Sequence, residues 1–160
     1  MSIVGNILYN IAARVAAVTA PTALGGVTRF EQLVREGAWS GETLRTLDAP
    51  TRRFVIELAG DRGPGLSLMR GLGEMAPVRQ TFVVVVAYKQ GAAGFALLKA
   101  IAEDVEALAL ELTVPASDRY GTADTGIWQR GTVSGYSVDW DPGKGGTALV
   151  RLPVTCDYLP

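Results

Sequence analysis

The chain has 160 residues, a formal net charge of -1 and 48% hydrophobic residues, which suits one domain with a real core and argues against disorder. The near-neutral charge gives no electrostatic reason for nucleic acid to be the main ligand, and the absence of histidine removes the commonest metal ligand and general base. The single cysteine, Cys156, excludes an intrachain disulfide and a thiolate zinc cluster, and it suits a reducing compartment.

The first predicted element is an amphipathic helix over residues 3–20, ending near Pro21. Asn6, Asn10 and Arg14 recur every four residues and form a polar stripe opposite the apolar positions. The end of the run faintly imitates a signal-peptide cleavage site, but no positive charge precedes it, so a helix that docks on the fold is favoured. The run is also too short and too interrupted to span a bilayer.

Between this helix and the first strand, little regular structure is expected. The small residues of 22–28 predict a connection, and apolar residues at helical spacing predict one or two helical turns over 30–34. Residues 38–52 have little periodicity and are expected to form an irregular surface segment. The first strand is predicted over 53–59, where apolar and polar residues alternate.

The segment 60–77 is an unusual loop, because it combines five glycines and two prolines with several large apolar residues. Loops run over wet surface and rarely expose so many apolar side chains. Flexible loops that contain methionine suit adaptable contacts, so we expect a partner to cover this loop, and folding back on its own domain is the less favoured alternative.

The structural centre is predicted to be a strand over 81–88 and a helix over 95–112. The strand is apolar on both faces, so it should be central in the sheet and covered above and below. The helix should bury one stripe against the sheet. This stripe contains Leu97, Ile101, Val105, Leu108 and Leu112, with Phe95 and Leu98 on its shoulder.

Two more strands are predicted after a long connection over 114–129. Residues 132–140 alternate weakly, and the glycine-rich 141–146 has the composition of a hairpin loop. The last strand, 148–158, has the clearest alternation in the chain. Pro153 cannot donate to a strand ladder, so this strand is expected to lie at a sheet edge or to be bulged there.

The order of elements predicts an α+β fold. We expect a mainly antiparallel four-stranded sheet with two principal helices packed on one face, in the order α-β-β-α-β-β. No internal repeat, low-complexity tract or linker divides the sequence, so a single domain over 1–160 is predicted.

Residue types and spacing provide no catalytic constellation. Residues 142–147 imitate a phosphate-binding loop, but Gly145 stands where Ser or Thr should follow the lysine, so a hairpin turn is favoured. Asp139, Asp141 and Asp157 are expected to be solvated, and carboxylates paired for acid–base chemistry stay an open alternative. Cys156 has no histidine to activate it, which favours a buried structural thiol over a nucleophile.

Aromatic residues and arginines complete the search for chemistry. Trp128, Tyr136 and Trp140 are not accompanied by a basic groove, so packing in a core or interface is favoured over base stacking. Four arginines flank or occupy the glycine-rich loop and are expected either to be solvated or to form ion pairs across a subunit boundary. They are Arg52, Arg53, Arg62 and Arg70.

The order and texture of the elements carry a family resemblance. The order begins with a helix, a strand over 53–59, a long loop and a strand over 81–88. It continues with a helix over 95–112, a connection containing Trp128 and a C-terminal hairpin ending in Leu152-Pro153-Val154-Thr155-Cys156-Asp157-Tyr158. This order resembles that of the tail terminator (tail completion) proteins of long-tailed bacteriophages. The resemblance covers the chain from about residue 53 to its end, and residues 22–52 depart from the shorter members.

The resemblance implies a virion structural protein and not an enzyme. Such proteins form a hexameric ring that caps the tail tube, ends its polymerisation and joins the tail to the head connector. The implied partners are further copies of the chain, the tail tube protein and the head–tail connector or neck protein. No cofactor, metal, membrane or sequence-specific nucleic acid is expected, and DNA would pass only through the ring lumen. The implied location is the head-proximal end of the virion tail, and the host cytoplasm during assembly.

Within this hypothesis the contacts between subunits, or with the tail tube, are expected in the glycine-rich loop and the Trp-containing connection. The candidate residues are Arg62, Leu66, Leu68, Met69, Arg70, Leu72, Met75, Tyr120 and Trp128. Two alternatives stay open: a head-completion or neck connector ring protein, and a small catalytic or ligand-binding α+β domain.

Overall fold

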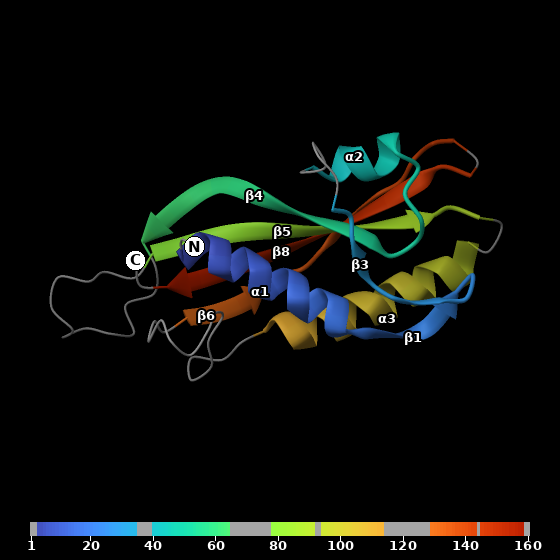
Figure 1. Ribbon diagram of the computed structural model, residues 1–160. Helices are drawn as coiled ribbons and strands as arrows, with labels where there is room; N and C mark the ends of the chain where they lie inside the picture. The colour runs from blue at the N-terminus through green and yellow to red at the C-terminus, as the bar shows by residue number, and fades with distance from the viewer. Residues whose placement is uncertain are drawn as a thin grey trace, which may run out of the picture.

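The computed structural model describes residues 3–34, 40–64, 78–91, 94–113, 129–143 and 145–158. Within them the chain is α+β, as predicted (Figure 1). The helices are α1 (Ile3–Ala17), α2 (Gly41–Thr46) and α3 (Gly94–Leu112). The strands are β1 (Thr19–Leu24), β2 (Val27–Arg29), β3 (Glu31–Gln32), β4 (Arg53–Pro64), β5 (Val78–Lys89), β6 (Gln129–Val133), β7 (Ser137–Asp139) and β8 (Thr147–Tyr158).

The main sheet has six strands and is mixed, so the predicted four-stranded antiparallel sheet in the order α-β-β-α-β-β is wrong. Its strand order is β3-β4-β5-β8-β6, and β7 also pairs with β8. The two-residue β3 runs parallel to β4, whereas the other pairs are antiparallel. A strand of two residues is too short to show alternation in a sequence, which is why β3 was not predicted.

The predicted centre of the fold is confirmed. β5 lies in the middle of the sheet, and residues 84–88 are buried. α1 and α3 cover one face, as expected for the two principal helices, while the short α2 covers part of the other (Figure 1). The predicted stripe of α3 is buried in the larger core, together with alternate residues of β8 from Ala148 to Tyr158.

The two residues predicted on the shoulder of the α3 stripe are exposed. Phe95 is 83% exposed and Leu98 is 49% exposed. The buried edge of the stripe is completed instead by Ala100 and by a charged residue, Asp104, which is fully buried. An apolar side chain one position from a helix stripe therefore does not reach the core here.

The predictions for the N-terminal third are largely wrong. The expected connection over 22–28 is a β1–β2 hairpin, whose turn residues Gly25 and Gly26 both have positive φ (55° and 77°), a conformation that glycine adopts readily. The helical turns expected over 30–34 are absent from the described residues there, which include β3, and the first helix ends at Ala17. The supposedly irregular segment 38–52 contains α2, whose buried Leu44 packs on the second face of the sheet.

Pro153 does not place β8 at an edge, because β8 lies between β5 and the β6–β7 side. The irregularity lies between the neighbouring strands β6 and β7, because Val133 pairs with Val154 and Ser137 pairs with Arg151. Residues 134–136 therefore lie opposite only two residues of β8, Leu152 and Pro153. The predicted single strand over 132–140 is therefore split in two. The hairpin predicted over 141–146 is confirmed, since β7 and β8 pair antiparallel across it.

Candidate functional site

The nine residues predicted to make contacts with other chains fall largely beyond the described structure. Arg62 lies in the distal half of β4, where its backbone pairs with Gln80 of β5. The other eight lie outside the described residues: Leu66, Leu68, Met69, Arg70, Leu72, Met75, Tyr120 and Trp128.

The two segments that contain those residues adjoin the same end of the main sheet. Pro64 pairs with Val78, Val78 with Tyr158, and Tyr158 with Gln129, so these four residues form the last row across β4, β5, β8 and β6. Segment 65–77 joins the first two residues of this row, and segment 114–128 leads into the last. The chain termini also lie at this end (Figure 1).

Specific polar contacts support the sheet at this end. β4 is bulged between Leu58 and Arg62, and the buried Gln80 side chain donates a hydrogen bond of 2.8 Å to the carbonyl oxygen of Ala59 within the bulge. One row from the end, Arg79 Nε lies 3.0 Å from Asp157 Oδ1, and this hydrogen bond raises the pKa of Arg79. These contacts fix the backbone of β4, β5 and β8 at this end of the sheet.

A buried polar cluster lies near the other end of the sheet, on the face that α3 covers. The guanidinium of Arg52 makes a bidentate contact with the Asp104 carboxylate of α3, at 2.8 and 3.0 Å, and both side chains are fully buried. Arg52 Nη2 also donates to the Thr22 carbonyl at 2.5 Å, and Nη1 donates to the Val27 carbonyl. One side chain therefore joins the β1–β2 hairpin to α3.

Tyr88 completes this cluster from β5. Its hydroxyl donates a 2.7 Å hydrogen bond to Asp104, and burial, with the adjacent carboxylate, raises the pKa of Tyr88 well above 10.0. The buried Asp104 carboxylate therefore has hydrogen-bond partners and is closed off from solvent, so the cluster has a structural role.

The expectation that Arg52 is solvated, or pairs across a subunit boundary, is wrong. Sequence reasoning also missed Asp104 as a partner. The available signal was its place: an aspartate within the apolar stripe of a helix needs a buried partner.

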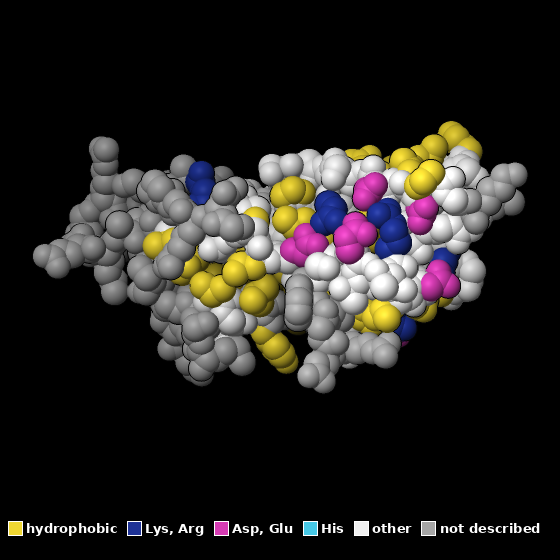
Figure 2. All heavy atoms as spheres, turned by 90° about the horizontal axis from the view of Figure 1, so that it is seen from above, with side chains coloured by type: hydrophobic (Ala, Val, Ile, Leu, Met, Phe, Trp, Pro, Cys, Tyr) yellow, Lys and Arg dark blue, Asp and Glu magenta, His cyan; other side chains and the backbone are white. Residues whose placement is uncertain are grey.

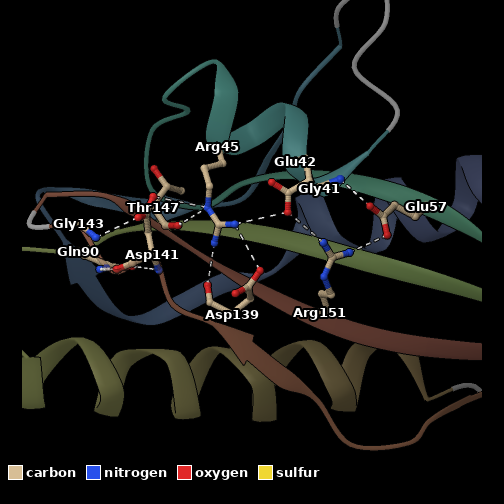
Figure 3. A network of polar contacts seen from close by, with 10 residues as sticks. All are labelled: Gly41, Glu42, Arg45, Glu57, Gln90, Asp139, Asp141, Gly143, Thr147 and Arg151. Carbon is tan, nitrogen blue, oxygen red and sulfur yellow. Dashed lines mark hydrogen bonds and ion pairs between the residues drawn. The ribbon is translucent and has the colours of Figure 1, made fainter.

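A second polar network covers the α2 side of the sheet, and its charged side chains gather on that face (Figure 2). Arg45 of α2 donates to Asp139 Oδ2 at 3.3 Å and to the Thr147 carbonyl at 3.2 Å (Figure 3). Arg151 of β8 donates to Glu57 at 2.8 Å. Each of these carboxylates is paired with an arginine, as in a structural ion-pair network.

The positions of these carboxylates and of β8 test several predictions about chemistry. Asp139 and Asp141 lie near Arg45, and Asp139 is opposite Leu149 of β8. Asp157 pairs with Arg79 and lies eight residues after Leu149 on β8, which is about 26 Å along the strand. The three carboxylates therefore do not converge. The strand β8 begins at Thr147, where a phosphate-binding loop would lead into a helix, which excludes a phosphate loop there.

Other potential chemical groups are also accounted for. Cys156 is buried as predicted, and burial raises the pKa of its thiol to about 12. Within the ranges that the structure covers, no three His, Cys, Asp or Glu residues are grouped to hold a metal ion, and no helix is long and apolar enough to cross a membrane. Tyr136 is 50% exposed and Trp140 is 43% exposed, and Trp128 is outside the described residues.

No protein-family model matches the chain, and no curated protein matches its sequence. The candidate site is the end of the sheet formed by Pro64, Val78, Tyr158 and Gln129, to which the segments 65–77 and 114–128 are attached.

Proposed function

We propose that the chain is a structural subunit of a bacteriophage virion, a tail terminator that acts by ring assembly and surface complementarity. In this proposal a homo-hexameric ring caps the tail tube, ends its polymerisation and presents a second surface to the head connector. The chain carries out no catalysis and needs no cofactor. Its partners are its own copies, the tail tube protein and the neck protein, at the head-proximal end of the tail.

The observation that carries the proposal is the attachment of both candidate contact segments to one row of the sheet. Segment 65–77 leaves and re-enters the sheet at Pro64 and Val78, and segment 114–128 enters it at Gln129. A rigid scaffold that anchors loops at one of its ends is a common way to build a binding surface. The buried Arg52–Asp104 pair stabilises the opposite end of the sheet.

The test begins with the mass of the purified protein and images of its particles. A hexameric ring that stops polymerisation of purified tube protein supports the proposal. A strictly monomeric chain at high concentration, with and without tube protein, contradicts it.

Deletion of residues 66–75 tests the site itself. The deletion should weaken ring formation or tube docking while leaving the monomer folded by far-UV circular dichroism. Leu47→Ser is the matched control, because Leu47 is an exposed apolar residue at the end of α2 and should not affect assembly. If the deletion unfolds the monomer, the loop belongs to the core and the assigned interface is wrong.

Particles from phage that lack the protein distinguish termination from head joining. Overlong tails beside free heads indicate lost termination. Unattached tails of normal length indicate a neck connector instead, and they would overturn the terminator assignment.

A further inference from the structure

The outer face of α3, which points away from the core, is unusually apolar. The buried stripe of α3 packs on the sheet, and the opposite face of a helix in this position is normally polar. The exposed apolar residues on this face are Phe95, Leu98, Ala102 and Leu110, and the exposed fractions of Phe95 and Leu110 are 83% and 82%. Apolar residues gathered on one exposed face mark an interaction site, whereas scattered ones do not.

These residues lie on one side of the helix and span most of its length. At 100° per residue, the other positions of this face lie within about 60° of the direction of Phe95, namely Leu98, Lys99, Ala102, Glu106 and Leu110. The buried residues Leu97 and Asp104 point the other way. At 1.5 Å per residue, the face extends about 22 Å from Phe95 to Leu110, which is long enough for a helix–helix contact.

Contacts of α3 with α1 and β1 lie beside this face and do not cover it. The Thr22 hydroxyl of β1 donates a hydrogen bond of 2.6 Å to Glu103, and Arg14 of α1 donates one of 3.2 Å to the Glu111 carbonyl. At 100° per residue, positions 103 and 111 lie about 80° and 160° from Phe95. The outer face is therefore accessible to a second molecule.

The residues of the outer face are arranged symmetrically about Ala102. Phe95 and Leu110 lie about two helical turns from it, one on each side, and Lys99 and Glu106 lie about one turn from it. The face thus has a large apolar residue at each end and two opposite charges inside them. The small side chain of Ala102 at the centre lets a second helix approach closely.

This symmetry matches a second copy of α3 that runs in the opposite direction. With a two-fold axis beside Ala102, Phe95 of each copy lies beside Leu110 of the other, and Lys99 of each lies beside Glu106 of the other. A parallel pair would instead place Lys99 beside Lys99 and Glu106 beside Glu106. Charge therefore favours the antiparallel pair over the parallel one.

Both charges of the outer face are available for a contact with a second copy. The Lys99 side chain is 66% exposed, and its Nζ lies 3.6 Å from Oε1 of Glu103, whose other carboxylate oxygen accepts from Thr22. Glu106 is exposed. An exposed ion pair within one helix is weak, so Lys99 can turn towards a second copy at little cost.

We propose that the outer face of α3 binds the same face of a second copy of this chain, antiparallel and about a two-fold axis beside Ala102. Both copies use the same surface, so this contact differs from the head-to-tail contact that closes a ring, and it does not depend on the function proposed above. In a chain that also forms rings, it joins one ring to another.

Cysteine cross-linking of the full chain tests the arrangement directly. Ala102→Cys places each thiol beside its own counterpart, so mild oxidation should give a disulfide-linked dimer. Ala109→Cys on the same face is the matched control, because its two copies lie about 20 Å apart in the antiparallel pair. The native Cys156 is buried. Failure of Ala102→Cys to cross-link would overturn the inference, as would equal cross-linking by Ala109→Cys, which a parallel contact gives.

Reversing the charges tests recognition between copies. In sedimentation velocity over a concentration series, Lys99→Glu should associate roughly tenfold more weakly than wild type, because it turns both opposite-charge pairs into like-charge pairs. Adding Glu106→Lys to the same chain restores opposite pairs and should recover the wild-type affinity. Glu106→Lys alone replaces Lys99→Glu if the far-UV spectrum of that variant departs from wild type. Equal association by the wild type, the single variant and the double variant contradicts the antiparallel contact.

The expected change in mass separates this contact from ring assembly. Leu110→Lys should turn a dimeric chain into monomers, or paired rings into single rings. Leu47→Lys is the control, since Leu47 is an exposed leucine at the end of α2, on the other face of the sheet, and this variant should behave as wild type. A wild-type chain that forms only single rings refutes the two-fold contact and leaves the terminator proposal standing.

Discussion

Replacing Arg52 with methionine should be among the most damaging single substitutions in the described structure. Methionine keeps much of the length of the side chain and removes the guanidinium, so the buried Asp104 carboxylate keeps only the Tyr88 hydroxyl. Breaking a buried ion pair from one side costs about 3–5 kcal/mol. Against a total stability of roughly 5–15 kcal/mol for a domain, this is a large fraction.

The neighbouring arginine provides the control. Arg53 pairs with Glu31 at 3.0 Å, but these side chains are 30% and 66% exposed, so Arg53→Met should cost about 0–1 kcal/mol. Urea unfolding followed by circular dichroism measures both variants. At about 2–4 °C per kcal/mol for a chain of this size, Arg52→Met should melt roughly 6–20 °C below wild type.

A double variant identifies the cause. Arg52→Met combined with Asp104→Asn removes the uncompensated charge and keeps an acceptor for the Tyr88 hydroxyl, so it should recover much of the lost stability. The reasoning is refuted if Arg52→Met falls within 1 kcal/mol of Arg53→Met, or if the double variant is no more stable than the single one.

Further predictions concern three positions, Tyr88, Cys156 and Gly41. Tyr88→Phe should destabilise by about 1.5–3 kcal/mol, since the hydroxyl donates to a buried carboxylate; Tyr158→Phe should not, because its buried hydroxyl has no partner in the described structure. Because the pKa of Tyr88 is raised in the folded chain, its contribution to stability is fully present below about pH 10 and is lost as the pH rises further. Melting curves of Tyr88→Phe at alkaline pH should lack this loss of stability. Cys156, with a pKa of about 12, should react with a thiol reagent at pH 8 only as fast as the chain unfolds, and rapid labelling of the native protein contradicts this. Gly41→Ala should cost about 1–3 kcal/mol in urea unfolding, since a Cβ would lie 2.8 Å from a sheet methyl group, whereas Gly94→Ala meets nothing within 4 Å and should be neutral or stabilising.

The parts of the fold that were predictable from sequence have long periodic patterns. β8 alternates over its 12 residues, and α3 repeats its stripe over 19, so a few misplaced residues do not obscure the period. α2 has six residues and one buried leucine, which no periodicity can reveal. β3 exists because Glu31 and Leu33 donate to backbone carbonyls of residues 52 and 54, a contact between distant segments.

The candidate site was predictable only as a location. The composition of 60–77 indicated a contact segment, but its attachment beside segment 114–128 depends on the register of β5 with β8 and β6. The Arg52 cluster required the β1–β2 hairpin, whose carbonyls accept two of its hydrogen bonds. Arg52 also has a φ of 64°, which is uncommon outside glycine, and its residue type does not signal that conformation.

The pairing at the middle of the sheet sets an order for folding. β5 pairs with β8, and the residue numbers of the partners differ by 80 for Val78 and Tyr158 and by 58 for Lys89 and Thr147. Every contact of this ladder must close a long loop of chain, whereas the β1–β2 and β7–β8 hairpins form locally. The hairpins can therefore form early, and the slow step is the meeting of β5 with β8. Until that step, the last row of the sheet does not exist, so a nascent chain cannot present its two attached segments together.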